Sequence, residues 1–293
     1  MKKFLNLSKS FYGPVIIAIF LLLFLGFAIY LVNSGKNKQR QHTKQHTSEI
    51  LSNKNHKAQN KNTTPSISIV VIELGLDKSL FEKAMNLPKK VTLGFSPYSP
   101  YLDYILELAQ KEKRDIIMNI PTDTLLLETA DYSFQDNGPY ALVPALEDSE
   151  NSKRLNFIIS KAKGFSGYYT SINDSFTDTV KDLTFLLNEL KESNQYIMYN
   201  DRRKVKPFMT IATKFNMQNR IIKADILLDS KLERSEIKSG LDELKNIADA
   251  YGHAIGIVRA YHISIDQVDK WLKEVDQNLG YNIVSLSELV NSF

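Results

Sequence analysis

The chain has 293 residues, of which 43% are hydrophobic, enough for one domain of roughly 200–250 residues and an appendage. It contains no cysteine, which excludes a disulfide, a thiol nucleophile and a thiolate metal site. The net charge of +4 averages two unlike parts: residues 1–64 carry ten Lys and Arg and one acid, whereas the remainder carries 27 bases and 32 acids. The acidic remainder disfavours nucleic-acid binding, because a surface that follows phosphates needs a basic excess.

The N-terminal part has the composition of a membrane anchor and its tether. A basic tail, residues 1–12, precedes the uncharged apolar run Val15–Val32, which as a helix would extend about 27 Å, close to the hydrocarbon thickness of a bilayer. We therefore expect a transmembrane anchor over residues 13–33, since the run is longer than the apolar region of a signal peptide. Residues 34–65 are rich in Lys, Asn, Gln, His and Thr, which predicts a disordered polar linker.

From residue 66 onward, short apolar runs alternate with amphipathic stretches of helical period. The predicted strands are Ile67–Ile72, Val91–Phe95, Asp115–Asn119, Gly167–Thr170, Tyr196–Tyr199, Ile221–Leu228, Ala254–Val258 and Ile283–Val284. The predicted helices are Lys78–Met85, Tyr101–Lys113, Glu150–Lys163, Asp178–Glu192, Val205–Asn216, Glu236–Tyr251, Ile265–Gln277 and Leu286–Val290. This alternation predicts an α/β domain over residues 66–293, a parallel sheet curled into a distorted barrel of seven or eight β/α units.

One segment does not fit the alternation. Residues 122–147 have no apolar periodicity and contain Asn137-Gly138-Pro139. A loop of this length inside a compact domain is usually functional or a lid.

Three carboxylates fall at or just beyond predicted strand ends, where ligands bind in parallel α/β sheets. They are Glu73, Asp123 and Asp229. Two of them could converge as the paired acids of a glycoside hydrolase. Alternatively, each caps the helix that follows or pairs with a base such as Arg202 or Arg259. Tyrosine rings near the barrel mouth, Tyr98 and Tyr169 among them, could stack on sugars or simply pack in the core.

The order of the short motifs resembles the divergent polysaccharide deacetylase family over roughly residues 67–290. The motifs are Val71-Ile72-Glu73-Leu74-Gly75, Phe95-Ser96-Pro97-Tyr98-Ser99-Pro100, Ile120-Pro121-Thr122-Asp123, Gly138-Pro139-Tyr140-Ala141-Leu142, Asn173-Asp174-Ser175-Phe176-Thr177, Asp201-Arg202, Leu227-Leu228-Asp229 and Ala254-Ile255-Gly256-Ile257. The resemblance implies a barrel in which an Asp-Asp pair and two histidines surround a metal-activated water, with a divalent ion such as Zn²⁺, that removes an acetyl group from a sugar amide.

At each of these functional positions the chain departs from the family pattern. The Asp-Asp pair falls on Ile72-Glu73, and the histidine of the third strand falls on Asn119. The histidine that follows the fourth strand falls on Ser171, and the one that follows the seventh falls on Arg259. A guanidinium does not ligate a cation. The resemblance therefore implies a degenerate site without the metal.

The histidine count leads to the same expectation. Of five histidines, three lie in the linker, which leaves His253 and His262. His253 follows a predicted helix end, where a cation faces the helix dipole favourably. His262 lies close to Arg259 in sequence and either faces the pocket or remains at the surface.

We therefore expect a single-pass inner-membrane protein with its domain in the periplasm, without a cofactor, that binds a glycan or another envelope component. Basic residues on both sides of the apolar run leave its orientation undecided by charge. The alternatives are an active hydrolase using Glu73, Asp123 and Asp229, and a protein-interaction module of the envelope. The expected pocket residues are Glu73, Tyr98, Asn119, Asp123, Tyr169, Ser171, Asp201, Arg202, Asp229, Arg259 and His262.

Overall fold

The structure is a computed structural model, which describes residues 64–126, 133–135, 137–144, 146–171, 179–200, 207–278 and 280–292. The predicted tail and anchor, and all but the last two residues of the predicted linker, lie outside the described residues. Within the described ranges, no helix is long and apolar enough to cross a membrane.

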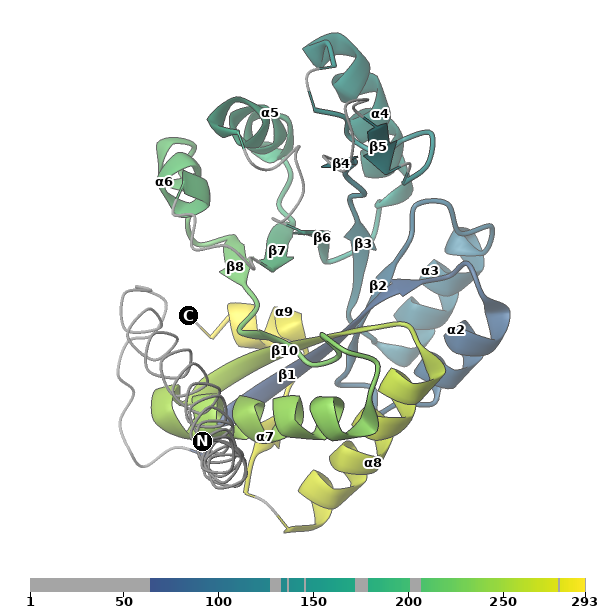
Figure 1. Ribbon diagram of the computed structural model, residues 1–293, viewed down its shortest axis with the longest axis vertical. Coiled ribbons are helices and arrows are strands. Elements are labelled where there is room, and N and C mark those ends of the chain that lie inside the picture. Colours follow the sequence, from purple (N-terminus) through teal and green to yellow (C-terminus); the bar gives the residue numbers. More distant parts are fainter. Residues whose placement is uncertain are drawn as a thin grey trace, which may run out of the picture. The chain divides into compact units, whose positions relative to one another are not determined.

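A curled, wholly parallel sheet forms the centre of the domain (Figure 1). Its strands are β1 (Ser66–Leu74), β2 (Thr92–Phe95), β3 (Ile116–Asn119), β6 (Gly167–Ser171), β7 (Tyr196–Asn200), β8 (Ile221–Lys223), β9 (Ile226–Leu227), β10 (His253–Arg259) and β11 (Asn282–Ile283). The order across the sheet is β8-β7-β6-β3-β2-β1-β10-β9, and β11 pairs with β1. Buried parallel strands of this kind are consistent with a (β/α) barrel, as the apolar runs predicted.

The two ends of this order are joined by one short segment of chain. β8 pairs with β7, whereas β9, two residues later, pairs with β10 at the other end of the sheet. The amide of Ala224 donates to the carbonyl of Tyr199 at 2.8 Å, and the amide of Asp225 donates to the carbonyl of Ile255 at 2.9 Å. The single predicted strand Ile221–Leu228 is therefore split in two, because its halves serve opposite edges of the sheet.

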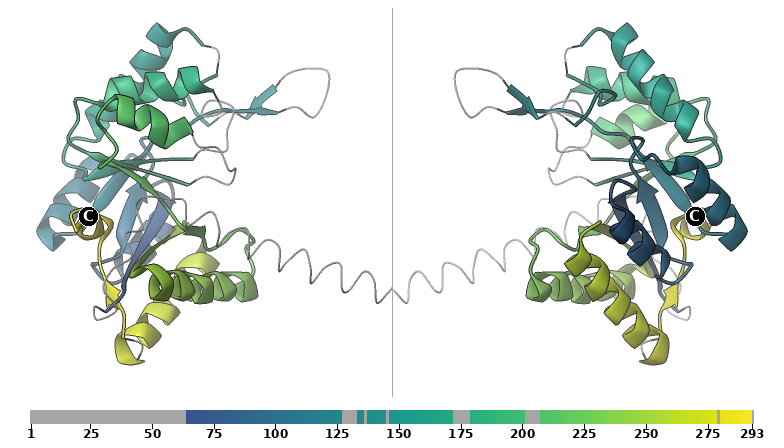
Figure 2. Two further views of the ribbon diagram at one scale, coloured as in Figure 1. Left: turned by 90° about the vertical axis from the view of Figure 1, so that its left-hand side faces the viewer. Right: turned by 90° about the vertical axis from the view of Figure 1, so that its right-hand side faces the viewer.

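Helices cover the outer face of the sheet (Figures 1 and 2). They are α2 (Lys78–Met85), α3 (Leu102–Glu112), α4 (Asp148–Lys161), α5 (Val180–Leu190), α6 (Pro207–Lys214), α7 (Arg234–Tyr251) and α8 (His262–Asn278). A further short helix, α9 (Leu286–Val290), packs against the interior residues instead. Each predicted helix is confirmed: Lys78–Met85 and Leu286–Val290 have the predicted bounds, and the ends of the others are displaced by at most three residues. The long loop is only partly irregular: β4 (Thr124–Leu126) and β5 (Ser133–Gln135) form an antiparallel pair, which the lack of periodicity did not reveal.

Side chains alternate between two buried layers along each strand. In β3, Ile116 and Met118 face the helices, whereas Ile117 faces the barrel interior. In β7, Ile197 faces the helices and Met198 faces the interior. Because both faces are buried, the strands read as continuous apolar runs and the interior is filled rather than open.

The short helix α9 closes the N-terminal end of the barrel. Its Leu286 and Leu289 are buried in the interior cluster with residues of the strands. The amide of Leu286 donates to the hydroxyl of Thr92, and the amide of Ser287 donates to the carboxylate of Asp115, both at 2.9 Å. Thr92 also donates to Asp115 at 2.9 Å. The helix is thus fixed by apolar burial together with a buried polar network.

Substitution of Thr92 by Val should lower the free energy of unfolding by about 1–3 kcal/mol, because the amide of Leu286 and the carboxylate of Asp115 each lose a buried partner. Urea unfolding measures the change. Thr213, exposed on α6, provides a matched control, and Thr213→Val should change stability by less than about 0.5 kcal/mol. Equal effects of the two substitutions would contradict a role for Thr92 in holding α9.

Candidate functional site

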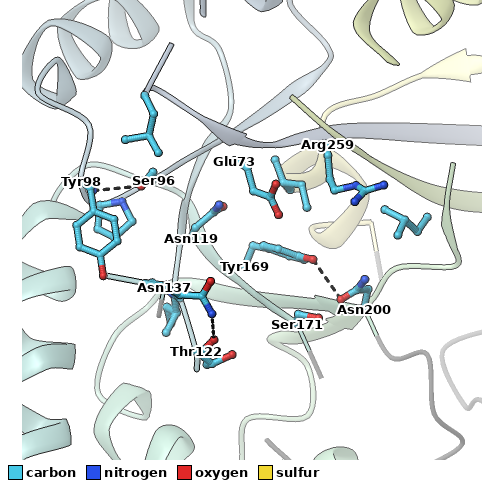
Figure 3. Close-up of a pocket in the computed structure, with 16 residues that line it drawn as sticks. Glu73, Ser96, Tyr98, Asn119, Thr122, Asn137, Tyr169, Ser171, Asn200 and Arg259 are labelled. Atoms are coloured by element: carbon cyan, nitrogen blue, oxygen red, sulfur yellow. Dashed lines mark hydrogen bonds between the residues drawn. The ribbon is translucent and has the colours of Figure 1, made fainter. Parts of the chain in front are cut away.

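A cavity of about 620 Å³ opens at the carboxyl ends of the strands, opposite α9 (Figure 3). This volume lies in the range of small-molecule sites. The interior-facing position at the end of three strands carries a polar residue: Asn119 in β3, Ser171 in β6 and Asn200 in β7. Arg259 occupies the corresponding position of β10. The apolar interior therefore ends in a polar layer that forms the cavity floor.

Glu73 reaches the cavity through an irregularity at the end of β1. Val70 and Ile72 face the interior, so regular alternation would direct residue 73 outward. Instead Glu73 has φ 66°, and the register between β1 and β2 shifts between Val71 and Leu74. Hydrogen bonds hold the backbone on both sides of residue 73. The amide of Ala260 donates to the Ile72 carbonyl at 3.0 Å, and the amide of Ser96 donates to the Leu74 carbonyl at 2.8 Å. A left-handed residue of this kind re-aims a side chain at a cost in strain.

Replacing Glu73 by Gly should raise the free energy of unfolding by about 0.5–1 kcal/mol, since glycine adopts positive φ without the steric penalty but is freer in the unfolded chain. Glu73→Ala retains the penalty and should give no such gain. Lys113, exposed at the end of α3 with φ 53°, is the matched control, and Lys113→Gly should stabilise similarly. Denaturant unfolding measures the free energy of unfolding of each variant. A lower value for Glu73→Gly than for the parent would show that residue 73 is not strained.

Arg259 is held in the cavity wall by a fully buried carboxylate. Asp229 has no exposed surface. Its oxygens accept from the Arg259 amide at 3.1 Å, from the Arg259 Nε at 3.4 Å and from the hydroxyl of Ser264 at 2.8 Å. The Arg259 guanidinium also donates to the Asp229 carbonyl and lies 5.2 Å from the ring centre of Tyr261. Asp229 is therefore committed to positioning Arg259.

The charge environment shifts the titration of Glu73. The pKa of the Glu73 carboxyl lies above its ordinary value, chiefly because the group is partly removed from water. The Arg259 guanidinium lowers this pKa, and the Asp229 carboxylate raises it. Because the folded pKa lies above the unfolded one, the folded state binds the proton more readily. The contribution of Glu73 to stability therefore falls as the pH rises past about 4.5.

Neutralising its two charged neighbours should move the Glu73 pKa in opposite directions. Arg259→Met removes a cation and should raise the pKa further, whereas Asp229→Asn removes an anion and should lower it. A carbon-detected NMR titration of the glutamate carboxyls measures both. Lys270→Met removes a cation exposed on α8 and serves as the control, with no expected shift at Glu73. Shifts of the same sign in both charge variants would refute this electrostatic description.

The amides of the cavity floor differ in their hydrogen bonding. Asn200 accepts a hydrogen bond from the hydroxyl of Tyr169 at 3.1 Å. Asn119 is about nine-tenths buried, yet its Oδ1 has no hydrogen-bond partner among the described residues. Buried polar atoms are nearly always paired. The Asn119 oxygen is therefore a buried acceptor left unpaired among the described residues, beneath the cavity floor.

The opposite wall is built from Tyr98 and the loop that contains Asn137. The Tyr98 hydroxyl accepts from the amide of Tyr140 at 3.1 Å, and the Asn137 side chain donates to the carbonyl of Thr122 at 2.7 Å. Asp123 accepts from the amide of Asn137 at 2.9 Å. Gly138 has φ 101°, and a Cβ there would lie 2.6 Å from the Tyr98 ring. The Tyr98 ring can take this position because residue 138 is a glycine.

The structure places the residues expected from the sequence in three groups. The cavity is lined by Glu73, Tyr98, Asn119, Tyr169, Ser171 and Arg259. Asp123 and Asp229 lie behind the wall, where each holds a lining residue, and His262 is exposed at the start of α8. Asp201 and Arg202 lie outside the described residues.

Sequence reasoning did not single out Asn200, Ser96 or Asn137 as cavity residues. Asn200 could have been found, because it stands two positions after the interior residue Met198 in a strand. Asn137 could not, because its position depends on a bond to Asp123 that only the folded loop creates.

The donors at the cavity do not fit the metal that the resemblance implies. The four assigned positions offer one carboxylate, one amide, one hydroxyl and a guanidinium, namely Glu73, Asn119, Ser171 and Arg259. Within the part of the chain that the structure describes, no group of three or more His, Cys, Asp or Glu residues could hold a metal ion. An ion-paired guanidinium in the wall repels a divalent cation. We therefore derive no chemical step through a metal.

The sequence profile of the divergent polysaccharide deacetylase family matches residues 69–290, nearly the whole described domain. The chain belongs to this family. No curated protein matches it in sequence.

Two solved structures share the fold of this deacetylase-family chain. An uncharacterized protein from Agrobacterium tumefaciens C58 is 26% identical, with a TM-score of 0.67 over 79% of this chain and 91% of its own. A putative cellobiose-phosphate cleavage protein from Enterococcus faecalis V583 is 12% identical, with a TM-score of 0.50 over 78% of this chain and 99% of its own. The second likeness concerns the fold alone.

Proposed function

We propose that this domain is a catalytically degenerate member of the deacetylase family that binds a glycan in the cavity at the barrel mouth. The observation that carries the proposal is the ion pair of Arg259 with the buried Asp229, which occupies the place where the family would hold a metal-ligating histidine. Because the described residues offer no set of metal ligands, we assign the cavity to recognition.

The lining supports a sugar as the ligand. Hydroxyl and amide groups from five strands or loops face the cavity, among them Ser96, Asn119, Asn137, Ser171 and Asn200. Such groups both donate and accept, which matches the hydroxyls of a carbohydrate. Tyr98 and Tyr169 add ring surface with a polar edge.

The rival hydrolase would need paired carboxylates, and the described residues offer one in the cavity. Asp229 is fully buried against Arg259, and Asp123 is 6% exposed and bonded to the amide of Asn137. Glu73 alone faces the cavity. The raised pKa of Glu73 suits proton transfer, so activity assays are part of the test.

The full chain, purified in mild detergent, should bind β-1,4-linked glucose or glucosamine oligomers by calorimetry, with an affinity that EDTA does not change. Asn200→Leu should weaken binding by at least about fivefold, since one hydrogen bond in the cavity is lost. Asn188→Leu on the exposed face of α5 is the control and should bind as the parent does.

Acetate release from acetylated oligomers, measured with added Zn²⁺, Co²⁺ or Mg²⁺, should stay at the level of the buffer. Metal-dependent release that Glu73→Ala abolishes would replace the binding proposal with an active enzyme. Binding of an envelope protein, with no affinity for any oligomer, would favour the interaction module.

The same proposal includes the location expected from the sequence, an envelope domain tethered by residues 13–33 and the linker. A reporter fused to the C-terminus, active only in the periplasm, tests the orientation. Activity of a reporter that works only in the cytoplasm would place the domain on the other side.

A further inference from the structure

Five segments at the amino end of the barrel, here called the basic rim, carry an excess of lysine. Each leads from the end of a helix into the next strand; they are residues 86–91, 111–115, 161–166, 191–195 and 214–220. Their exposed lysines are Lys89, Lys90, Lys111, Lys113, Lys161, Lys163, Lys191 and Lys214. Glu192 is the one exposed acid in these segments. Lys90 pairs with Glu288 of α9.

Hydrogen bonds join the five segments into one continuous surface. Arg114 donates to three carbonyls of residues 85–88, and the amide of Ser166 donates to the Ile116 carbonyl at 2.9 Å. The Gln195 side chain donates to two carbonyls of segment 161–166, and the Arg220 guanidinium donates to carbonyls of segment 191–195. The arginines of the rim are therefore used to hold its backbone, whereas its lysines are left exposed.

The parallel fold explains why the lysines gather at one end. A lysine at the C-terminal end of a helix is favoured by the helix dipole, and this local preference needs no ligand. In a β/α barrel every helix ends on the same side, so the preference of each helix adds to that of its neighbours. The resulting surface is basic, although residues 65–293 as a whole carry 27 bases and 32 acids.

The chain enters the domain at the same end. Ser66 is the first residue of β1, and its amide donates to the Gly252 carbonyl at 2.9 Å. The Pro65 carbonyl accepts from the amide of Asn282 at 2.8 Å. Because β1 is parallel to the other strands of the sheet, its first residue lies at the end that carries the rim. The expected linker, residues 34–65, therefore joins the domain on its basic side.

We propose that the basic rim docks on a bilayer that contains anionic phospholipids, with the lysine ammonium groups against the lipid phosphates. This inference goes beyond glycan binding and rests on the proposed anchor at residues 13–33, which brings the domain to a bilayer. Lysines beside a membrane are attracted to anionic headgroups within about one Debye length, roughly 8–10 Å. Lysines spread over five segments suit a wide charged plane better than a single bound phosphate.

Docking would also orient the cavity. The cavity opens at the carboxyl ends of the strands, which is the end of the barrel opposite the rim. A docked domain therefore presents its cavity away from the bilayer, whereas an undocked domain has no preferred orientation. The experiment below measures this orientation.

The full chain has no cysteine, so one introduced cysteine carries one fluorophore. Asn194→Cys labels the basic rim, and Ser149→Cys labels the start of α4 at the other end of the barrel; both positions are exposed. The chain is reconstituted into vesicles of phosphatidylcholine, with or without about 30% phosphatidylglycerol as the anionic lipid. Energy transfer from the fluorophore to an acceptor on the lipid headgroups is measured.

In the anionic vesicles, transfer from the rim label should be at least about threefold that from the α4 label, and about 0.5 M salt should remove most of this difference. In phosphatidylcholine alone, the two labels should give similar transfer. Both comparisons use the parent lysines, so they do not depend on the folding of a charge variant.

Two matched sets of substitutions test the lysines themselves. The rim set is Lys111→Gln, Lys113→Gln, Lys161→Gln and Lys163→Gln. The control set, at exposed positions outside the rim, is Lys78→Gln, Lys153→Gln, Lys181→Gln and Lys231→Gln. The rim set should abolish the difference between the labels, and the control set, which removes the same charge, should retain it.

The outcomes separate docking from the anchor and from glycan binding. Equal transfer from the two labels in anionic vesicles, or a difference that neither salt nor the rim set lowers, overturns docking and leaves the anchor intact. Release of the chain from vesicles by alkaline carbonate overturns the anchor, and docking with it. A difference that the rim set abolishes and the control set retains supports docking. Oligomer calorimetry tests glycan binding separately, because no rim lysine lines the cavity.

Discussion

The left-handed backbone at Glu73 is the local feature on which the site depends. Regular alternation along β1 would direct residue 73 toward the helices, and the shift of register after Val71 turns it into the cavity instead. Hydrogen bonds from the amides of Ala260 and Ser96, the residues that follow β10 and β2, hold this conformation on either side. The neighbouring Gly75 has φ 101°, and Ser99 packs where a Cβ would stand. Strain of this kind persists where the surrounding structure over-determines it, as at ligand sites.

The two ends of the barrel are built from different kinds of side chain. At the N-terminal end, Thr92 and Asp115 bond to the backbone of α9, whose leucines fill the interior. At the C-terminal end, the polar layer of Asn119, Ser171 and Asn200 faces a cavity. Active sites of parallel barrels lie at the carboxyl ends of the strands, because loops there vary without disturbing the packed layers beneath. Residues at this end can therefore change without loss of the fold.

The ion pair of Arg259 with Asp229 shapes the electrostatic field of the cavity wall. A metal centre would bring positive charge to the carboxyl ends of the strands, whereas the guanidinium here is neutralised by a fully buried acid. Among the described lining residues, Glu73 is then the one carboxylate without an ion pair.

The sequence by itself determined the alternation of strands and helices, the family, and six of the lining residues, because buried parallel strands are continuous apolar runs and site residues follow their ends. Tertiary structure decided what could not be read from spacing. It divided the predicted strand Ile221–Leu228 between two edges of the sheet, placed Asp123 and Asp229 behind the wall as supports, and left His262 at the surface. Which face a residue joins at a strand end depends on backbone irregularities and long-range hydrogen bonds, and neither leaves a periodic signal in the chain.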